Sequence, residues 1–289
     1  MYSATTVKPR GISAELVTWM RFGVVTVLVI AVYAEILIDL AREWWTSPEA
    51  SYGMLIPPFA LYLAYAGRAH TMSLPNRPDV RGLGLVAAAC LILLCGKLAS
   101  EFFLCRISFT IMLAGLAWTF WGGLRLRSVV FNLGLLTTMV PIPAIVYNSA
   151  AAPLQLFASK VATQLAQMLG VTVFRDGNVI HLATISLGVA EACSGLHSLS
   201  ALVVASLVLG FVENLSALGR ILIFLVSAPL AIMVNVCRVT GTAILADSRP
   251  ELALGYYHAF SSWLVFLIGF GALWLTTKLV FRFSGPDLS

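Results

Sequence analysis

Long apolar runs separated by short polar loops fill most of the chain. Several of these runs approach the roughly 20 residues that an α-helix needs to cross a bilayer. The pattern predicts about eight transmembrane helices. Their expected ranges are Phe22–Leu40, Tyr52–Ala66, Gly82–Leu98, Ile107–Leu124, Ser128–Tyr147, Ser194–Val212, Leu218–Cys237 and Ala259–Phe281. The second contains Pro57-Pro58, so we expect it to be kinked or to span only part of the membrane.

The one long stretch without a spanning pattern covers residues 153–190. Its first part, Pro153–Leu169, is predicted to be an amphipathic helix at the outer surface. Its second part places two β-branched runs beside Asp176-Gly177, which is a strong β-hairpin signal. An open sheet edge is costly in lipid, so the hairpin should lie at the water interface or be covered by protein. The prediction is an all-α polytopic membrane protein, one domain over residues 1–289, with a small extracytoplasmic hairpin before the sixth helix.

Composition supports a membrane protein and excludes two other classes. Hydrophobic residues make up 60% of the 289 residues and charged residues only 11%, and the mean hydropathy is +0.93. Soluble domains carry about 25% charged residues. Disordered chains are polar and charged. Neither class fits this sequence.

The net charge of +5 indicates membrane orientation rather than nucleic-acid binding. With the N-terminus inside, 11 of the 18 basic and four of the 13 acidic residues fall on the inner side. That side then carries +7 and the outer side −2. By the positive-inside rule, we expect both termini in the cytoplasm, with residues 1–21 forming a cytoplasmic segment.

Three polar clusters are predicted to lie at the same depth at the outer face. They are Glu191, Cys193, Ser194 and His197 where the hairpin meets the sixth helix, Asn235 and Arg238 at the end of the seventh, and His258 at the start of the eighth. A thiol in the first turn of a helix feels the positive end of the helix dipole, which favours the thiolate. A thiolate, a proton-transfer group and a cation for an oxyanion are the parts that acyl transfer needs. Each residue alone also has a structural explanation, as a packing cysteine, a snorkelling arginine or an interfacial histidine.

The segment VAEACSGLHSL, followed by NVCRV and His258, resembles the exosortase/archaeosortase family. The segments WWTSPEASYGMLIPPFALYL and PIPAIVYNSAAAPLQLFASKVATQLAQMLGVTVFRDGNVIHL extend the resemblance from about Trp44 to His258. It implies a membrane-embedded cysteine transpeptidase or protease of the bacterial inner membrane, active at the periplasmic face. The implied substrates are exported proteins with a C-terminal PEP-CTERM sorting tail. Such a tail has a Pro-Glu-Pro motif, one transmembrane helix and an Arg-rich end.

The resemblance also implies roles for individual residues. By motif position, Cys193 is the nucleophile, Arg238 the essential arginine and His258 the proton-transfer group. His197 stands where the family often has arginine. It is the rival base, because it lies four residues from Cys193 on one helix. The resemblance implies no metal, no cofactor and no nucleic-acid partner, and it leaves the oligomeric state open.

Glu191, Asn235 and Arg175 each have two possible supporting roles. Glu191 could hydrogen-bond the catalytic histidine or Arg238, or simply be favoured in the first turn of a helix. Ser194 is a further candidate of the same cluster. Asn235 could orient Arg238 or donate to an oxyanion, and Arg175 could shape the hairpin turn or attract the acidic residue of the sorting motif.

Two other hypotheses are kept. Cys237 points about 100° away from Arg238 around a helix, so packing is its expected role and a redox pair with Cys193 is the alternative. In place of an enzyme, the chain could be a non-catalytic transporter or a scaffold linked to exopolysaccharide export. That reading predicts polar residues through the membrane depth and related halves. The sequence has neither feature.

Overall fold

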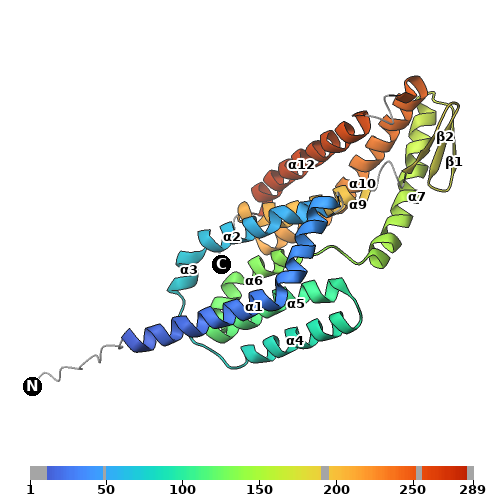
Figure 1. The fold of residues 1–289 in the computed structure, drawn as a ribbon. Helices are drawn as coiled ribbons and strands as arrows, with labels where there is room; N and C mark the ends of the chain where they lie inside the picture. The colour runs from blue at the N-terminus through green and yellow to red at the C-terminus, as the bar shows by residue number, and fades with distance from the viewer. Residues whose placement is uncertain (1–11, 48–49, 190–194, 252–255, 285–289) are drawn as a thin grey trace, which may run out of the picture. The chain divides into compact units, whose positions relative to one another are not determined.

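A computed structural model describes residues 12–47, 50–189, 195–251 and 256–284 (Figure 1). Helices make up most of it, together with one small three-stranded sheet, which confirms the all-α membrane class. The chain forms two compact units. The first unit comprises residues 1–46 and 58–140, and the second comprises residues 47–57 and 141–289.

The first unit is helical. Its helices are α1 (Ile12–Thr46), α2 (Ile56–Ala66), α3 (Arg68–Ser73), α4 (Gly82–Leu98), α5 (Phe102–Trp121) and α6 (Gly123–Thr137). The closest approach is between α4 and α5, where glycines leave room for the facing backbone. A Cβ on Gly115 would lie 2.8 Å from the Val86 nitrogen. Helix α1 joins this pair through a hydrogen bond of 3.0 Å between the buried Tyr33 and Ser108 hydroxyls.

The prediction of eight spanning helices is wrong. In the described part of the chain, four helices are long and apolar enough to cross a membrane: Met20–Thr46, Phe102–Trp121, Ala217–Ser248 and Trp263–Phe283. At most 33% of each spanning window is buried in the protein, which fits helices that face lipid. Helix α4 has the predicted bounds, but its 17 residues extend only about 25 Å against a hydrocarbon core of about 30 Å.

Proline explains two of the missing spans. Helix α2 has only 11 residues and begins just before Pro57-Pro58. The expected helix Ser128–Tyr147 is interrupted, because α6 ends at Thr137 and α7 (Ala144–Met168) begins after Pro143. Proline lacks a backbone donor, and the residue before it disfavours helical geometry. An apolar run is therefore divided into two shorter helices.

The second unit combines helices with the sheet. It holds the 3₁₀ turn η1 (Ser51–Leu55), α7, the strands β1 (Val173–Asp176), β2 (Val179–Leu182) and β3 (Ser186–Gly188), α9 (Gly195–Val212), α10 (Ala217–Ser248) and α12 (Tyr256–Ser284). Helix α10 packs against α7, α9 and α12. Figure 1 shows the sheet beside α7 and the C-terminal part of α10.

The predicted hairpin is confirmed, and a third strand extends it. Asp176 pairs with Val179, which leaves Gly177 in the turn with a φ of 59°. The unpredicted β3 adds to the other edge of β2, in the order β1-β2-β3. One face of the sheet is covered by protein, as expected, because Ile180 packs with residues of α7 and α10 in a buried core.

The backbone conformation of Gly122, between α5 and α6, can be tested for its contribution to the stability of the first unit. Its φ of 84° and ψ of 168° lie in a region that only glycine populates readily, and a Cβ there would collide with the Arg77 carbonyl oxygen. We expect Gly122→Ala to lower the free energy of unfolding by roughly 2 kcal/mol or more. Thermal unfolding in detergent measures this. The matched control is Gly134→Ala in α6, where a Cβ meets nothing within 4 Å, and an equal loss in both variants would contradict the explanation.

Candidate functional site

Four of the predicted site residues lie on three helices of the second unit. Asn235 and Arg238 lie on α10, His197 is in the first turn of α9, and His258 is in the first turn of α12. Cys193, Glu191 and Ser194 lie outside the described residues. The geometry of the site is therefore built from α10, from the helix starts and from the strand that leads toward Cys193.

Helix α10 continues for ten residues beyond Arg238, to Ser248. The prediction that this helix ends at Cys237 is wrong. Its 32 residues extend about 48 Å, which exceeds the hydrocarbon core of about 30 Å. The sheet packs on its C-terminal part, and sheet edges are costly in lipid. The excess length therefore belongs at the sheet end, and Arg238 lies near the boundary of the membrane.

Arg238 and Asn235 share the buried side of α10. Their exposed fractions are 8% and 6%, as expected for residues three apart on a helix. Cys237 between them is exposed and unbridged, which confirms that it points away from Arg238. Asn235 Oδ1 is buried and accepts no hydrogen bond from the described residues. A buried acceptor without a partner is unusual in a folded protein and calls for an explanation, such as an ordered water, a bound group or a functional role.

A contact around Gly269 fixes the relative depth of the three helices. A Cβ on Gly269 of α12 would lie 3.0 Å from Leu202 Cδ1 of α9 and 3.6 Å from Val234 Cγ1 of α10. Counting 1.5 Å per residue from this level, Arg238 lies about 6 Å further toward the sheet end and His197 about 8 Å. On the same scale, His258 lies about 16 Å from the Gly269 level, also toward the sheet end. On this count, Arg238 and His197 lie at similar distances from the Gly269 level, whereas His258 lies about 10 Å beyond Arg238. That the three side chains form one site stays a prediction.

The sheet fixes the chain just before the Cys193 segment. Val189, directly after β3, is 1% exposed and shares a core with Val239 and Ala243 of α10. Its backbone N–H donates to the Asn178 carbonyl oxygen at 2.9 Å. Cys193 follows Val189 by four residues in the sequence.

Sequence reasoning missed a contact between η1 and α9. The Tyr52 hydroxyl is hydrogen-bonded to Ser200, which lies three residues after His197 on the same face of the helix. Burial raises the pKa of the Tyr52 hydroxyl above its ordinary value, and the bond to Ser200 offsets part of the rise. The hydroxyl is therefore neutral at physiological pH. In the sequence, Tyr52 stands only at the start of an expected span, within the segment WWTSPEASYGMLIPPFALYL of the family resemblance.

Because Tyr52 and Ser200 share one hydrogen bond, we expect the effects of replacing them on stability to be coupled. Tyr52→Phe and Ser200→Ala should each lower the free energy of unfolding by about 1 kcal/mol, since each leaves one hydroxyl without its partner. The double variant should lower the free energy of unfolding by clearly less than the sum of the two single losses, because the second change removes no further bond. Thermal unfolding of the four proteins in one detergent measures this cycle. Strictly additive losses would contradict the bond.

Arg175 contacts its own turn. Its Nη1 donates to the Gly177 carbonyl oxygen at 2.7 Å, which fits the turn-shaping reading. Attraction of an acidic substrate residue by Arg175 stays a prediction.

The intramembrane acids Glu35 and Asp39 line a pocket of about 340 Å³ in the first unit, together with Lys97 and Arg106. Arg106 is 8% exposed, and its Nη2 lies 2.6 Å from Glu43 Oε2. No local pattern predicts this ion pair, because its members lie 63 residues apart on different helices.

Comparison with known proteins gives one match. A protein-family model described as a transmembrane exosortase matches residues 44–275, which is most of the chain and parts of both units. Neither the curated proteins nor the solved structures contain a match.

Proposed function

The chain belongs to the transmembrane exosortase family, and from this premise we propose that it is a cysteine transpeptidase or protease that removes PEP-CTERM sorting tails from exported proteins. The observation that carries the proposal is the buried Arg238–Asn235 pair at the depth where α9 begins. Gly195, the first residue of α9, lies about 10 Å from the Gly269 level, between the depths of Arg238 and His258. Cys193 precedes Gly195 by two residues.

In the proposed reaction, the Cys193 thiolate attacks a peptide carbonyl carbon near the Pro-Glu-Pro motif. A C–S bond forms, and Arg238 stabilises the oxyanion. The C–N bond then breaks as the histidine gives a proton to the leaving amine. An incoming amine or water attacks the thioester, loses its proton to the histidine and releases the Cys193 thiolate. The products are a new amide or a carboxylate, together with the freed tail.

Asn235 supplies a second polar group beside Arg238. Its Oδ1 is free to accept a hydrogen bond from a substrate N–H, and its amide nitrogen can donate to an oxyanion. Both roles agree with an acceptor that no described residue satisfies. Glu191 and Ser194 are proposed to line the same site, on either side of Cys193.

The two histidines differ in a testable way. We propose His258 as the proton-transfer group, because a partner from another helix approaches the thiol along a better line than an i+4 neighbour. His258→Ala should then reduce tail processing by roughly 100-fold, whereas His197→Ala should reduce it far less. A time course of tail removal for both variants measures this. Loss in His197→Ala alone would transfer the role to His197, whose backbone is closer in depth to Arg238.

The proposed location is the bacterial inner membrane, with both termini in the cytoplasm and the site at the periplasmic face. The charge asymmetry of the loops supports this orientation. Reporter fusions at the two termini test it: cytoplasmic activity of both fusions is expected, and periplasmic activity of either would overturn it.

The experiment that tests the function is co-expression with a protein that bears a Pro-Glu-Pro tail, followed by mass spectrometry of its C-terminus. A new C-terminus at one bond near the motif is expected. Its mass distinguishes a carboxylate from an attached acceptor. An intact tail in the presence of folded enzyme would contradict the proposal.

A further inference from the structure

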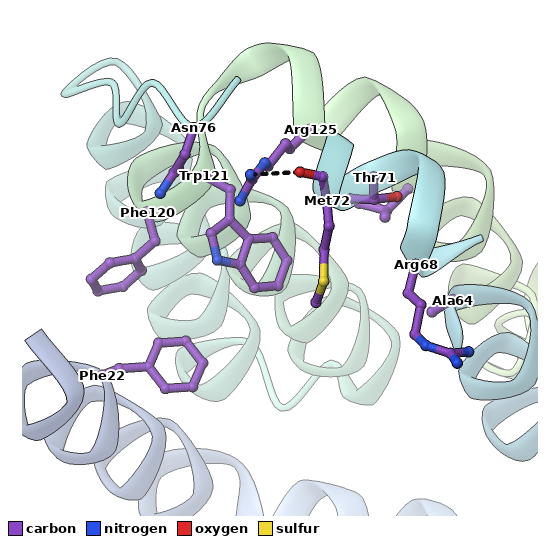
Figure 2. A pocket seen from close by; sticks show the side chains of 10 residues that line it. Phe22, Ala64, Arg68, Thr71, Met72, Asn76, Phe120, Trp121 and Arg125 are labelled. Atoms are coloured by element: carbon purple, nitrogen blue, oxygen red, sulfur yellow. Dashed lines mark hydrogen bonds between the residues drawn. The ribbon is translucent and has the colours of Figure 1, made fainter. Parts of the chain in front are cut away.

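A pocket in the first unit combines apolar walls with two cations. Its volume is about 540 Å³, within the range of roughly 300–1,000 Å³ that small-molecule sites occupy. It lies where α1, α3, α5 and α6 meet (Figure 2). The side chains that decide its chemistry are Phe22, Phe120, Trp121, Met72, Arg68 and Arg125. The proposed peptidase reaction uses none of them.

Neutral groups hold both arginines in place. Arg125 donates from Nε and Nη2 to the Leu74 carbonyl oxygen at 3.0 and 2.9 Å, and from Nη2 to that of Met72 at 3.2 Å. Arg68 donates to the Tyr65 carbonyl oxygen at 2.8 Å and lies 3.6 Å above the Tyr65 ring. Within the described ranges, neither guanidinium has a carboxylate partner. Each is fixed in position and keeps its positive charge.

The surroundings of the pocket strengthen its positive potential. Arg77 joins the α5–α6 junction through its N–H to the Trp121 carbonyl oxygen at 3.4 Å. The nearby carboxylate of Asp79 is engaged by the Arg81 backbone N–H at 2.9 Å. This end of the unit therefore favours an anionic ligand.

The walls of the pocket are suited to hydrocarbon. The rings of Phe22 and Phe120 pack edge to face at 5.8 Å, which joins α1 to α5. Phe22 and Trp121 remain 41% and 39% exposed, and both belong to helices that can span the membrane. In Figure 2, Arg125 lies beside the Trp121 ring, and Arg68 lies on the other side of Met72. A ligand that matches both parts has an anionic head and an apolar tail.

We propose that this pocket binds an anionic phospholipid. The anionic head lies toward the basic side of the pocket, where Arg125 and Arg68 stand on either side of Met72, and the acyl chains lie against Phe22, Phe120 and Trp121. Basic pockets between transmembrane helices are known to take such headgroups. The donors of the two arginines that these backbone bonds leave over can donate to phosphate oxygens. Because a free phosphate shares the headgroup chemistry, the experiment must separate the lipid from the ion.

Native mass spectrometry of the delipidated full-length protein in neutral detergent tests this. Phosphatidylglycerol should be retained at least about tenfold better than phosphatidylcholine with the same acyl chains, because charge-assisted bonds to the arginines favour the anion. Arg68→Gln and Arg125→Gln should each weaken this retention roughly tenfold. The matched control is Arg127→Gln, which removes the same charge from α6 outside the pocket lining, and it should change retention by less than about twofold.

The possible results of this experiment distinguish a bound phospholipid from a bound phosphate ion. Equal retention of the two lipids, displacement of phosphatidylglycerol by inorganic phosphate, or an equal loss in Arg127→Gln would each overturn the proposal. Arg125→Gln also removes bonds that hold the Leu74 segment. Arg68→Gln therefore serves as the second variant, since Arg68 bonds only within its own neighbourhood at Tyr65. Unchanged retention in a folded Arg68→Gln protein would contradict a two-arginine site.

Discussion

Tail processing falls below detection when Cys193 is replaced by alanine, which is the largest effect that we expect. Without the sulfur there is no thioester, and water would have to attack the peptide bond directly. Removal of a catalytic nucleophile lowers turnover by roughly 10⁴-fold or more. Co-expression of the variant with a tail-bearing substrate, followed by immunoblotting for the shortened product, measures the loss.

Cys237→Ala is the matched control for this variant. Cys237 is a free cysteine on α10, and its exposed side chain lies away from the buried face of that helix. Processing by Cys237→Ala should equal that of the unchanged protein. Complete tail removal by Cys193→Ala would contradict the assignment of the nucleophile, and loss in both variants would indicate that a disulfide or a common structural role matters instead.

The second large effect is expected from Arg238. Arg238→Gln removes the cation that the proposed reaction places at the oxyanion while keeping a polar, though shorter, side chain. Loss of one such stabilising group lowers turnover by roughly 100- to 1,000-fold. Initial rates of tail removal at saturating substrate measure the change. An unchanged rate would exclude Arg238 from the reaction.

Burial makes a control necessary here, because a change at a residue that is 8% exposed can also affect folding. Arg249→Gln changes the same residue type at the exposed C-terminal end of the same helix, and we expect no change in rate. Arg238→Lys retains the charge but loses the planar fork, so its rate should lie between those of Arg238→Gln and the unchanged protein. Equal thermal stability of Arg238→Lys and the unchanged protein would show that its lower rate reflects chemistry.

Local sequence patterns correctly predicted the elements whose bounds depend on neighbouring residues alone. The Asp176-Gly177 signal located the hairpin because a tight turn needs a residue with positive φ. The bounds Gly82–Leu98 matched α4 because glycine and polar residues flank a continuous apolar run. Strand β3 was missed, since its three residues have no pattern of their own and are ordered by pairing with β2.

The number of spans was overestimated because apolar content does not determine helix length. Pro143 and Pro57-Pro58 limit helices within apolar runs. The end of α10 was misplaced for a related reason. Residues after Arg238 include threonine, glycine and alanine, which read as the end of a membrane span, yet they form helix because they pack on the sheet and α7.

For the site, sequence motifs identified the residues and could not give their depth. The spacing of Asn235 and Arg238 correctly placed both on one face of a helix. The depth of His258 depends on how far α10 continues before the chain turns back, which no local pattern encodes. The Tyr52–Ser200 bond joins residues that are 148 positions apart, so only the packing of η1 on α9 reveals it.

The most direct test of the central claim is detection of the covalent intermediate. The enzyme is mixed with a tail-bearing substrate, quenched in acid and digested, and the peptide that contains Cys193 is weighed by mass spectrometry. We expect a thioester on Cys193 that carries the substrate fragment up to the cleaved bond and is released by hydroxylamine. Efficient tail removal with Cys193 unmodified at every time point, and unchanged in the Cys193→Ala protein, would contradict it.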